Sequence, residues 1–425
     1  PTWYQHECGP ASDYAPIQTD EHTQVLIIGA GLAGLSTAAS LVDRGFREIV
    51  ILEQGQPGEG ASGRNGGFVF GGYSRSPASL RKQLGQARAV HLQSLTHRAV
   101  ERVRSRCHDL GVPIEPHGVL LVDWFKNDKR LQRDAQRHQH NTGQEWTFLN
   151  QQRLQSEIRS QRYGSALLEA DAFHFNPLQY VRALSDWLVQ HGVRIHGHSR
   201  VDRMVRDSSG PSAVWSVRSN GVRIRAEQVV LACGGYAQGA FPKAQRAIQP
   251  IGTYISVTEP LGERLIEYLP TRAAVYDNRF AFDYYRRVGG DRLLWGGRIS
   301  IADRRPNQIE ALMRKDLRKV FPALADASFD FSWGGWMSYA RHEMPILGSP
   351  EPGLWSAYAF GGHGMAPTNV AGEVIAASIA GDASLMNEFS AWRAEWAGGG
   401  FGRLWAQGLY WAKQGADGLR ALRSS

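Results

Sequence analysis

The chain has 425 residues, of which 42% are hydrophobic and 21% are charged; this is typical of a folded protein with more than one domain and excludes a disordered or fibrous chain. The three cysteines, Cys8, Cys107 and Cys233, show no C-x-x-C spacing. Their pattern argues against a disulfide framework and a metal site, and it predicts a reducing, cytoplasmic location. The longest stretch without charged residues, 352–372, contains five glycines, and no leader pattern opens the sequence, so we expect no transmembrane segment.

The net charge of +8 raises the question of a polyanionic partner, because clustered basic side chains bind phosphate backbones. Most of the 48 basic residues are arginines, however, and they are spread over the whole chain. A solvated, arginine-rich surface is therefore the favoured interpretation, and we expect no nucleic-acid partner. A basic module that binds RNA is the alternative.

The predicted elements begin after an aperiodic arm of 20 residues. An apolar run at 25–28, a helical pattern at 32–41 and an apolar run at 49–52 predict a strand, a helix and a strand. Further along the chain we expect a long helix at 83–110, a helix at 180–190, strands at 194–196 and 228–233, antiparallel strands within 251–300, a helix at 309–320, a strand at 354–360 and a helix at 367–380. Nucleotide-binding patterns at both ends, with a β-rich segment between them, predict an α/β fold.

This order of elements predicts a discontinuous Rossmann-like domain that carries a second, antiparallel-sheet domain as insertions. The expected ranges are 1–82, 160–238 and 336–385 for the Rossmann-like domain, 83–159 and 239–335 for the substrate-binding domain, and 386–425 for a C-terminal helical tail. The tail carries several tryptophans among arginines. We favour packing of the tail on the body of the protein or on a partner subunit over a helix at a membrane surface.

The segment Gly29-Ala30-Gly31-Leu32-Ala33-Gly34 matches G-x-G-x-x-G directly after the first strand and at the start of the first helix. The first glycine makes a tight turn, the second lets the backbone approach a diphosphate, and the third lets helix and strand pack closely. Glu53 ends the second strand, where a carboxylate accepts the hydroxyls of an adenosine ribose. The unit therefore predicts a dinucleotide with an unphosphorylated ADP half, and by itself leaves FAD and NAD open.

The segment Gly60-Ala61-Ser62-Gly63-Arg64-Asn65-Gly66-Gly67 follows this acid closely and supplies further hydrogen-bond donors, which favours FAD. It resembles the same segment in the D-amino-acid-oxidase-like family of flavoproteins, in its γ-glutamylputrescine oxidoreductase branch. The resemblance also includes the aromatic arm at Trp3 and Tyr4, and the segments 257–261, 282–286, 292–297, 333–335, 345–348 and 361–364. It implies the architecture shared by D-amino-acid oxidase and glutathione reductase, and it implies FAD.

Carried over by position, the resemblance also implies which residues bind FAD. The ADP half would contact Gly29, Ala30, Gly31, Leu32, Ala33, Glu53 and Gln54, and the diphosphate and ring would contact Gly60, Ala61, Ser62, Arg64, Asn65, Gly66 and Gly67. Adenine would contact the backbone of Val201, the diphosphate side would contact Ala232, Cys233 and Gly234, and the pyrimidine edge of the ring would contact Gly362, His363, Gly364, Met365 and Ala366. Cys233 is interpreted as a small buried residue, not as a redox thiol.

A strand that leads through Gly361-Gly362-His363-Gly364 into a helix points free backbone N–H groups at the ligand above it. The partial positive charge at such a helix end stabilises a reduced, anionic flavin ring. His363 is a catalytic candidate, although we favour a packing or hydrogen-bonding role for it.

The sequence departs from its relatives at three places. Several relatives attach flavin through a cysteine in the segment equivalent to 336–344, which contains none here, so we predict non-covalent FAD, with a histidine linkage as the alternative. Met337 stands where the resemblance leads us to expect a carboxylate-binding arginine, and Ala366 stands where sarcosine-type members have a lysine. Both changes argue against a simple clamp for an α-amino-acid carboxylate and favour an amine, or an acid bound elsewhere.

We expect substrate contacts from the β-rich insertion and from the segment after 335. The candidates are Tyr254, Tyr285, Arg286, Trp336 and Arg341. Hydride transfer from an amine carbon to flavin N5 requires a close, aligned and unprotonated amine more than an acid–base pair. A site that lowers the pKa of the amine by burial would meet this need.

The sequence therefore predicts an FAD-dependent oxidoreductase that oxidises a C–N bond of an amine or an amino or imino acid. The imine product would be hydrolysed, and oxygen or an electron-transfer protein would accept the electrons. A γ-glutamylputrescine-type amine is the favoured substrate, and L-pipecolate or sarcosine-type imino acids are the alternative. A flavin monooxygenase or a non-catalytic flavoprotein is the alternative of another class.

Overall fold

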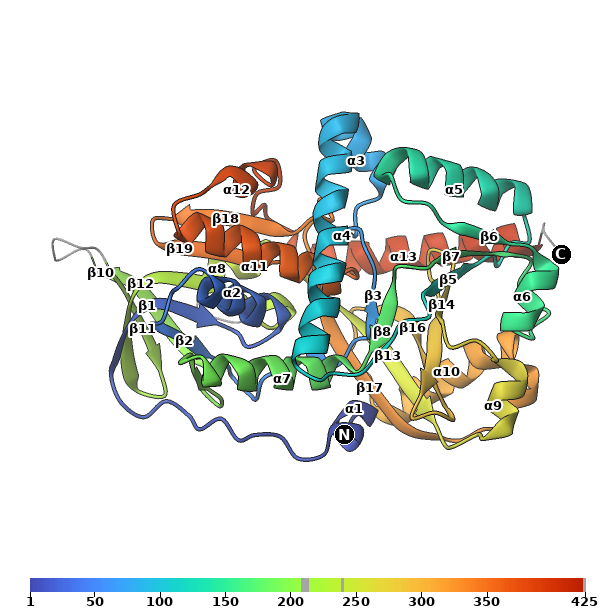
Figure 1. Cartoon of the computed structure of the whole chain (residues 1–425), viewed down its shortest axis with the longest axis horizontal. Helices are drawn as coiled ribbons and strands as arrows, with labels where there is room; N and C mark the ends of the chain where they lie inside the picture. The colour runs from blue at the N-terminus through green and yellow to red at the C-terminus, as the bar shows by residue number, and fades with distance from the viewer. Residues whose placement is uncertain (208–213, 238–240, 423–425) are drawn as a thin grey trace.

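The computed structural model describes residues 1–207, 214–237 and 241–422. Two large sheets lie in the two halves of an elongated molecule, and the long helix α4 (Gln86–Asp109) stands between the halves (Figure 1). A short helix, α1 (Trp3–Cys8), packs its two aromatic side chains near the junction of the halves. Within the described ranges, no helix is both long and apolar enough to cross a membrane.

The first sheet is the parallel, Rossmann-like one. In spatial order its strands are β10 (Val201–Asp207), β11 (Val214–Ser219), β12 (Val222–Leu231), β1 (Glu21–Ile28), β2 (Ile49–Leu52) and β9 (Arg194–His196), with β19 (Leu354–Tyr358) beside β12 and β18 (Ile346–Glu351) beside β19. Strand β1 runs parallel to β2 and β12, and β12 runs parallel to β19. The predicted strand–helix–strand unit is therefore confirmed, and its carboxyl ends share one edge of the sheet.

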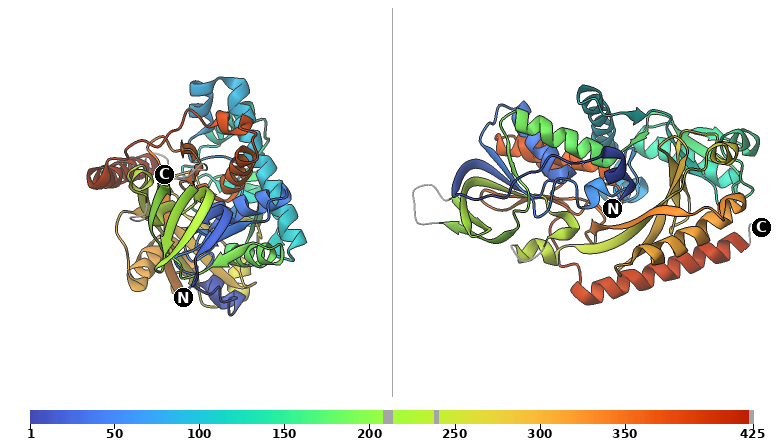
Figure 2. Two further views of the ribbon diagram at one scale, coloured as in Figure 1. Left: turned by 90° about the vertical axis from the view of Figure 1, so that its left-hand side faces the viewer. Right: turned by 90° about the horizontal axis from the view of Figure 1, so that it is seen from below.

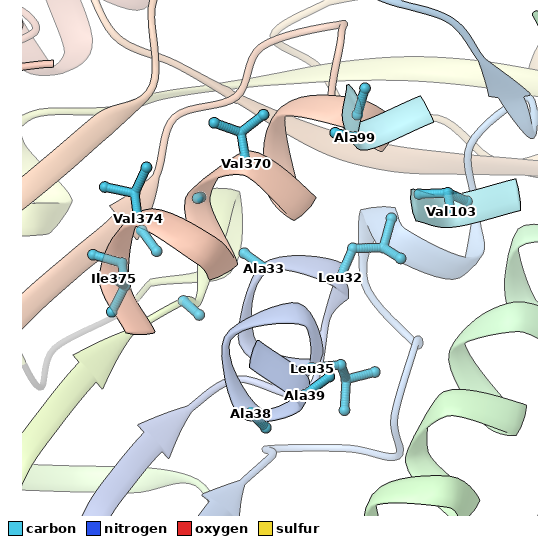
Figure 3. Close-up of a cluster of buried hydrophobic side chains, with 14 of the residues drawn as sticks. Leu32, Ala33, Leu35, Ala38, Ala39, Ala99, Val103, Val370, Val374 and Ile375 are labelled. Atoms are coloured by element: carbon cyan, nitrogen blue, oxygen red, sulfur yellow. The ribbon is translucent and has the colours of Figure 1, made fainter. Parts of the chain in front are cut away.

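Side chains of β1 alternate between the two faces of this sheet. Val25 and Ile27 face a layer that contains α2 (Leu32–Asp43), α4 and α11 (Met365–Ile379), while Leu26 and Ile28 face the opposite core. Figure 3 shows small and branched side chains of these three helices meeting in that layer. Gly372 permits the close approach of α11 to α2, because a Cβ there would lie 2.5 Å from the carbonyl carbon of Ser36.

The second sheet is mostly antiparallel. In spatial order its strands are β17 (Phe329–Tyr339), β13 (Gln249–Thr258), β16 (Arg292–Ser300), β15 (Tyr284–Val288), β14 (Ala274–Asp277), β5 (Val119–Val122), β7 (Ala166–Glu169) and β6 (Thr147–Leu149). Helix α10 (Pro306–Val320) packs on one face of it through Met313 and Leu317. The predicted mixed α/β fold, with a Rossmann-like sheet and a second antiparallel sheet, is confirmed.

The remaining elements connect and cover these sheets. The small third sheet contains β3 (Phe68–Val69), β8 (Phe173–Phe175) and β4 (Ile114–Glu115). The other helices are α3 (Pro77–Leu84), α5 (Asp128–Thr142), α6 (Gln151–Glu157), α7 (Pro177–Gln190), α8 (Pro242–Arg246), α9 (Glu263–Tyr268), α12 (Ser384–Glu388), α13 (Gly399–Leu422), η1 (Ala61–Gly63), η2 (Gly234–Tyr236) and η3 (Pro322–Leu324).

The long helix predicted at 83–110 is present as α4, and it begins at Gln86 because Gly85, with a φ of +82°, separates it from α3. The domain ranges stay a prediction, and the sheets divide the chain slightly differently. Strand β7 and the last four residues of β17 lie in the second sheet, although the ranges 160–238 and 336–385 place them with the first. Helix α4 packs on α11, although it falls in the range 83–159.

The tail forms helix α13, which lies along one edge of the second-sheet half (Figure 2). Gln407, Tyr410 and Asp417 each accept a hydrogen bond from a backbone N–H group of the body, so the tail packs on the body of its own chain. Its apolar side chains include Phe401 and Trp405, which are 85% and 77% exposed and border the large cavity of the molecule.

Candidate functional site

A cavity of about 1530 Å³ runs from the carboxyl ends of β1 and β2 to the inner face of the second sheet. Of the residues predicted to bind FAD, those that line it are Gly29, Gly31, Leu32, Ala33, Glu53, Gln54, Gly60, Ala61, Ser62, Arg64, Asn65, Gly66, Val201, Ala232, Cys233, Gly234, Gly362, His363, Gly364 and Met365. Ala30, Gly67 and Ala366 lie outside this lining. Across the part of the chain that the structure describes, no group of three or more His, Cys, Asp and Glu side chains could hold a metal ion.

The turn between β1 and α2 requires its glycines. Gly29 has a φ of +111°, and a Cβ there would lie 2.8 Å from the carbonyl oxygen of Ala232 on the neighbouring strand end. A Cβ on Gly34 would lie 2.0 Å from the carbonyl oxygen of Gly29. Gly31 caps α2 without a side chain, and Leu32 and Ala33 at the start of the helix line the cavity. The N-terminus of a helix stabilises a diphosphate placed beside it.

Glu53 connects the two strand ends. One of its carboxylate oxygens accepts from the backbone N–H of Ala30 (2.8 Å), and the other accepts from that of Gly55 (3.1 Å). Burial raises the pKa of Glu53, and these two hydrogen bonds oppose that rise. Because a carboxylate has about four acceptor positions, Glu53 can still accept from both hydroxyls of a ribose in the cavity.

We expect Glu53→Gln to weaken FAD binding about 10- to 100-fold, since hydrogen bonds to a charged group contribute about 1.5–3 kcal/mol. The change keeps the size of the side chain, and titration of apoprotein with FAD measures it directly. Glu48→Gln, an exposed residue just before β2, is the matched control and should bind FAD like the wild type. Equal affinities for the two variants would contradict the ribose role.

The loop 60–67 is fixed by a hydrogen bond to the start of α2 and by hydrogen bonds within the loop. The hydroxyl of Ser62 accepts from the backbone N–H of Leu32 (2.8 Å), which joins the loop to the start of α2. The side-chain amide of Asn65 donates to the carbonyl of Ser62 (2.9 Å), and its oxygen accepts from the N–H of Gly67 (2.8 Å). Asn65 therefore stabilises the conformation of the loop itself.

Three consecutive carbonyl groups of this loop accept hydrogen bonds from outside it. The Arg64 carbonyl accepts from the indole N–H of Trp333 (3.0 Å), the Asn65 carbonyl accepts from the hydroxyl of Tyr4 (2.9 Å), and the Gly66 carbonyl accepts from Nε of Arg286 (2.7 Å). Trp333 and Arg286 belong to the second sheet and Tyr4 belongs to α1. The second sheet and the amino-terminal helix thus fix the loop that lines the cavity.

Arg286 was predicted to contact substrate, but it lies outside the cavity lining and is 4% exposed. Besides Gly66, its guanidinium donates to the carbonyl of Phe175 (2.8 Å) and to the hydroxyl of Tyr4 (3.1 Å). It also lies 3.3 Å from Nδ1 of His174. Arg286 therefore supports the loop and does not reach the cavity.

His174 is held neutral in this network. Because a guanidinium only donates, Nδ1 of His174 accepts from Arg286, and Nε2 donates to the carbonyl of Arg272 (2.8 Å). Burial, and then the charge of Arg286, lower the pKa of His174 to about 3. A proton on Nδ1 would face the guanidinium and break the contact.

We expect His174 to make the protein less stable in mild acid. The folded pKa, about 3, lies below the ordinary value of about 6.5, so the unfolded state binds the extra proton first as the pH falls. The free energy of unfolding should then fall by about 1.4 kcal/mol per pH unit below about pH 6.5. His174→Gln should lack this contribution, and urea titrations at pH 7.5 and pH 5 measure the difference between variant and wild type. The difference in free energy of unfolding between His174→Gln and the wild type should be smaller at pH 5 than at pH 7.5. His108→Gln, at an exposed histidine, should match the wild type at both pH values.

The predicted Gly-Gly-His-Gly turn lies at the far end of the cavity. Ala359 and Gly361 have φ values of +68° and +63°, so the chain turns sharply after β19. The hydroxyl of Ser74 accepts from the N–H of Gly362 (3.0 Å) and fixes the turn. Gly364 caps α11 without a side-chain hydrogen bond, which leaves N–H groups of this helix end for a ligand.

His363 lines the cavity, and its ring packs edge-on against Phe70 at 5.3 Å between centroids. Burial lowers the pKa of His363 to about 4, so the side chain is neutral at pH 7. Burial also raises the pKa of Cys233 to about 12, which keeps this thiol protonated. Neither residue supplies a charge to the cavity.

Two predicted substrate residues face away from the cavity. Tyr285 is fully buried and stacks on Trp295 at 4.6 Å between centroids, and Tyr254 is 2% exposed and donates to the carbonyl of Ala302. Their sequence neighbours Thr253 and Tyr284 line the cavity instead. Alternation along a strand puts neighbouring side chains on opposite faces, so Tyr254 and Tyr285 do not lie where a substrate in the cavity would contact them.

Trp336 and Arg341, the other two substrate candidates, do line the cavity. Met337 also lines it, and its sulfur lies 3.8 Å from the position that a Cβ on Gly362 would take. Several further cavity residues, which come from separate strands and loops, were not predicted from the sequence, namely Phe70, Ser74, Thr253, Tyr276, Phe282, Tyr284 and Tyr339. Only the alternation within the β-rich segment could have indicated Thr253 and Tyr284.

The fold and the cavity together define a dinucleotide-binding protein whose cavity extends from a Rossmann-like sheet to the face of a second sheet. The glycine turn, Glu53, Ser62 and the amino-terminal ends of α2 and α11 fit FAD in this cavity. The family model described as DAO, FAD dependent oxidoreductase, matches residues 24–378. The chain belongs to this family, so it is an FAD-dependent oxidoreductase.

The chain is similar to curated relatives over most of its length. It is 30% identical to the gamma-glutamylputrescine oxidoreductase of Escherichia coli (strain K12) over 387 residues, which cover 89% of each chain. It is 28% identical to the probable oxidoreductase OrdL of Haemophilus influenzae over 385 residues, which cover 88% of this chain and 87% of the relative.

Solved structures confirm the fold. The glycine oxidase from Bacillus cereus ATCC 14579 superimposes with a TM-score of 0.70 at 18% identity, over 86% of this chain and 98% of that one. The L-proline dehydrogenase from P. horikoshii superimposes with a TM-score of 0.72 at 16% identity, over 87% of this chain and 96% of that one.

Proposed function

We propose that the protein oxidises a C–N single bond of an amine, of the γ-glutamylputrescine type, with non-covalent FAD and with oxygen as the electron acceptor. The observation that carries this proposal is the continuous cavity that joins Glu53 and the glycine turn to an aromatic chamber. The chamber is lined by Phe70, Tyr276, Phe282, Tyr284 and Trp336.

The chamber suits amine oxidation because of what its side chains exclude. Burial raises the pKa values of Tyr276 and Tyr284 and lowers that of His363, so all three are neutral at pH 7. Apolar and aromatic walls disfavour an ammonium ion and so favour the neutral amine that can be oxidised. They also hold the reacting carbon in place and exclude water until the oxidation is complete.

FAD supplies the two-electron acceptor for this reaction. The substrate carbon gives up a hydride, the nitrogen lone pair forms the C=N bond, and the nitrogen loses its remaining excess proton to solvent. Water then adds to the imine, and the product splits into a carbonyl compound and a free amine or ammonia. Oxygen takes up two electrons and two protons to give hydrogen peroxide.

Three further observations support the details of the proposal. The similarity to the gamma-glutamylputrescine oxidoreductase of Escherichia coli favours an amine substrate. Both ring nitrogens of His342 contact backbone groups, those of Arg393 and Met344, and segment 336–344 contains no cysteine, which supports non-covalent FAD. The low cysteine count supports a cytoplasmic location, and the dispersed arginines support the absence of a nucleic-acid partner.

The test is the visible spectrum of the FAD-loaded protein, recorded without oxygen before and after each member of a substrate panel. The panel contains polyamines, γ-glutamylated amines, N-methyl amino acids and cyclic imino acids. We expect γ-glutamylated amines to bleach the flavin band and air to restore it. Bleaching by imino acids alone would replace the proposed substrate, and no bleaching by any member would refute amine oxidation.

A further inference from the structure

The turn that follows β17 presents two opposite charges to the cavity. The N–H of Glu343 donates to the carbonyl of Ala340 (3.0 Å) and closes the turn. The side chains of Arg341 and Glu343 are exposed, and both line the cavity. The two side chains form no ion pair or hydrogen bond with each other, and neither has such a partner among the other described residues.

The turn is held in place from outside by its middle residue. Nε2 of His342 lies 3.1 Å from the carbonyl oxygen of Arg393, and Nδ1 accepts from the N–H of Met344 (3.3 Å). The carbonyl of His342 accepts from the guanidinium of Arg75 (3.0 Å). Glu343 is held at a φ of +59°, a strained conformation for a residue with a side chain. Strain of this kind is maintained at ligand sites when surrounding contacts fix it.

Arg341 differs from two other arginines that line the cavity. Arg279 forms ion pairs with two buried aspartates, and Arg298 makes a two-pronged contact with Asp316 at 2.6 and 2.7 Å. Their charges are therefore already compensated within the protein. The guanidinium of Arg341 is free to bind a carboxylate of a ligand, a geometry that arginine favours.

Glu343 adds a restriction on the ligand. A carboxylate beside an amine favours the protonated ammonium form. An ammonium has no lone pair to form a C=N bond, so the nitrogen that Glu343 would bind is not the nitrogen of the oxidised C–N bond. The ligand therefore has a second nitrogen for the reaction.

We propose that Arg341 and Glu343 together bind the zwitterionic α-amino-acid head group of a substrate whose reacting amine lies further along the molecule. This inference rests on the proposed function and adds the residues that recognise its substrate, an amine joined through a spacer to a free α-amino acid, as in γ-glutamyl amides. Arg341 binds the α-carboxylate and Glu343 binds the α-ammonium.

Four putrescine amides test the two contacts separately. γ-Glutamylputrescine carries both charges of the head group, N-glutarylputrescine lacks the ammonium, N-(4-aminobutanoyl)putrescine lacks the carboxylate, and N-butanoylputrescine lacks both. The rate of flavin reduction in the FAD-loaded protein without oxygen gives kcat/KM and the limiting rate for each amide. Arg341→Gln and Glu343→Gln are the test variants, and Arg137→Gln, at an exposed arginine of α5, is the control.

We expect Arg341→Gln to lower kcat/KM about 10- to 100-fold for the two amides with a carboxylate, because charged hydrogen bonds are the strong ones. It should leave the two amides without a carboxylate unchanged. Glu343→Gln should likewise lower kcat/KM for the two amides with an ammonium in the head group and leave the two without it unchanged. The limiting rate should stay unchanged in every case, since neither residue contacts the reacting atoms. An equal loss for all four amides, or no loss for any, would overturn the proposal.

γ-Glutamylbutylamide separates this proposal from the proposed function, because it keeps the head group and the chain but lacks the terminal amine at which the proposed oxidation takes place. We expect it to bind the FAD-loaded wild type in calorimetry and to bind Arg341→Gln more weakly. Such binding without bleaching by any amine would support the head-group site and refute amine oxidation. Bleaching that does not depend on Arg341 or Glu343 would support amine oxidation and refute the head-group site. The absence of both binding and bleaching would refute both proposals.

Discussion

Gly34→Ala is expected to abolish FAD binding. The added Cβ would lie 2.0 Å from the carbonyl oxygen of Gly29 and 3.1 Å from Cγ2 of Ile27. A backbone oxygen cannot move away without moving the turn that faces the diphosphate. Overpacking costs about 1–3 kcal/mol or more, and we expect a value at or above the upper end, which lowers FAD affinity more than about 100-fold.

Gly415→Ala is the matched control for this change, because Gly415 is also inside a helix and a Cβ there would have no neighbour within 4 Å. Alanine in a helix interior is favoured over glycine by about 0.5–1 kcal/mol, so this variant should keep its FAD and melt at the same or a higher temperature. FAD titration and thermal melts compare the two variants. Wild-type affinity in Gly34→Ala would show that α2 and the turn separate at little cost.

Arg286→Met is expected to lower the free energy of unfolding by about 3–5 kcal/mol and to weaken FAD binding. The change leaves the buried carbonyls of Gly66 and Phe175 and the hydroxyl of Tyr4 without their donor. Each buried polar group without a partner costs about 1–3 kcal/mol. Denaturant titration of the apoprotein and of the FAD-loaded protein measures both effects.

Arg287→Met, at the next residue of the same strand, is the control. Among the residues that the structure describes, its guanidinium hydrogen-bonds only to the carbonyl of Gly290 in the adjacent hairpin, so we expect a change within about 0.5 kcal/mol. Arg286→Lys should recover little stability, because an ammonium cannot reproduce the fork of three hydrogen bonds. Full recovery with lysine would show that charge, not geometry, supports the loop.

The parts of the site that the sequence predicted depend on contacts between near neighbours. The glycine turn, Glu53 and the Gly-Gly-His-Gly turn each lie at the end of a strand, and that position follows from a local pattern. Alternation predicts that Tyr284 and Tyr285 face opposite sides of a sheet, but it does not tell which side faces the cavity. The packing of Tyr285 against Phe321, the residue directly after α10, decides this, and Phe321 is more than 30 residues away in sequence.

The support of the loop 60–67 could not be predicted for the same reason. Tyr4, Arg286 and Trp333 reach it from positions that are 61, 220 and 269 residues distant. Their sequences carry no sign of a shared partner. Arg286 therefore looked like a substrate contact, because an arginine in an aromatic strand has the same pattern in either role.

The hydrogen bonds from Tyr4, Trp333 and Arg286 to three successive carbonyls have a thermodynamic consequence for the whole molecule. The backbone of residues 64–66 lines the cofactor cavity and also forms the contact between the two halves of the molecule. An ordered conformation of this backbone favours both FAD binding and the packing of the second sheet on the loop. The two equilibria are therefore coupled, and by linkage the coupling is reciprocal. Binding of FAD should therefore stabilise the contact between the two halves, and changes that weaken this contact should lower the affinity for FAD.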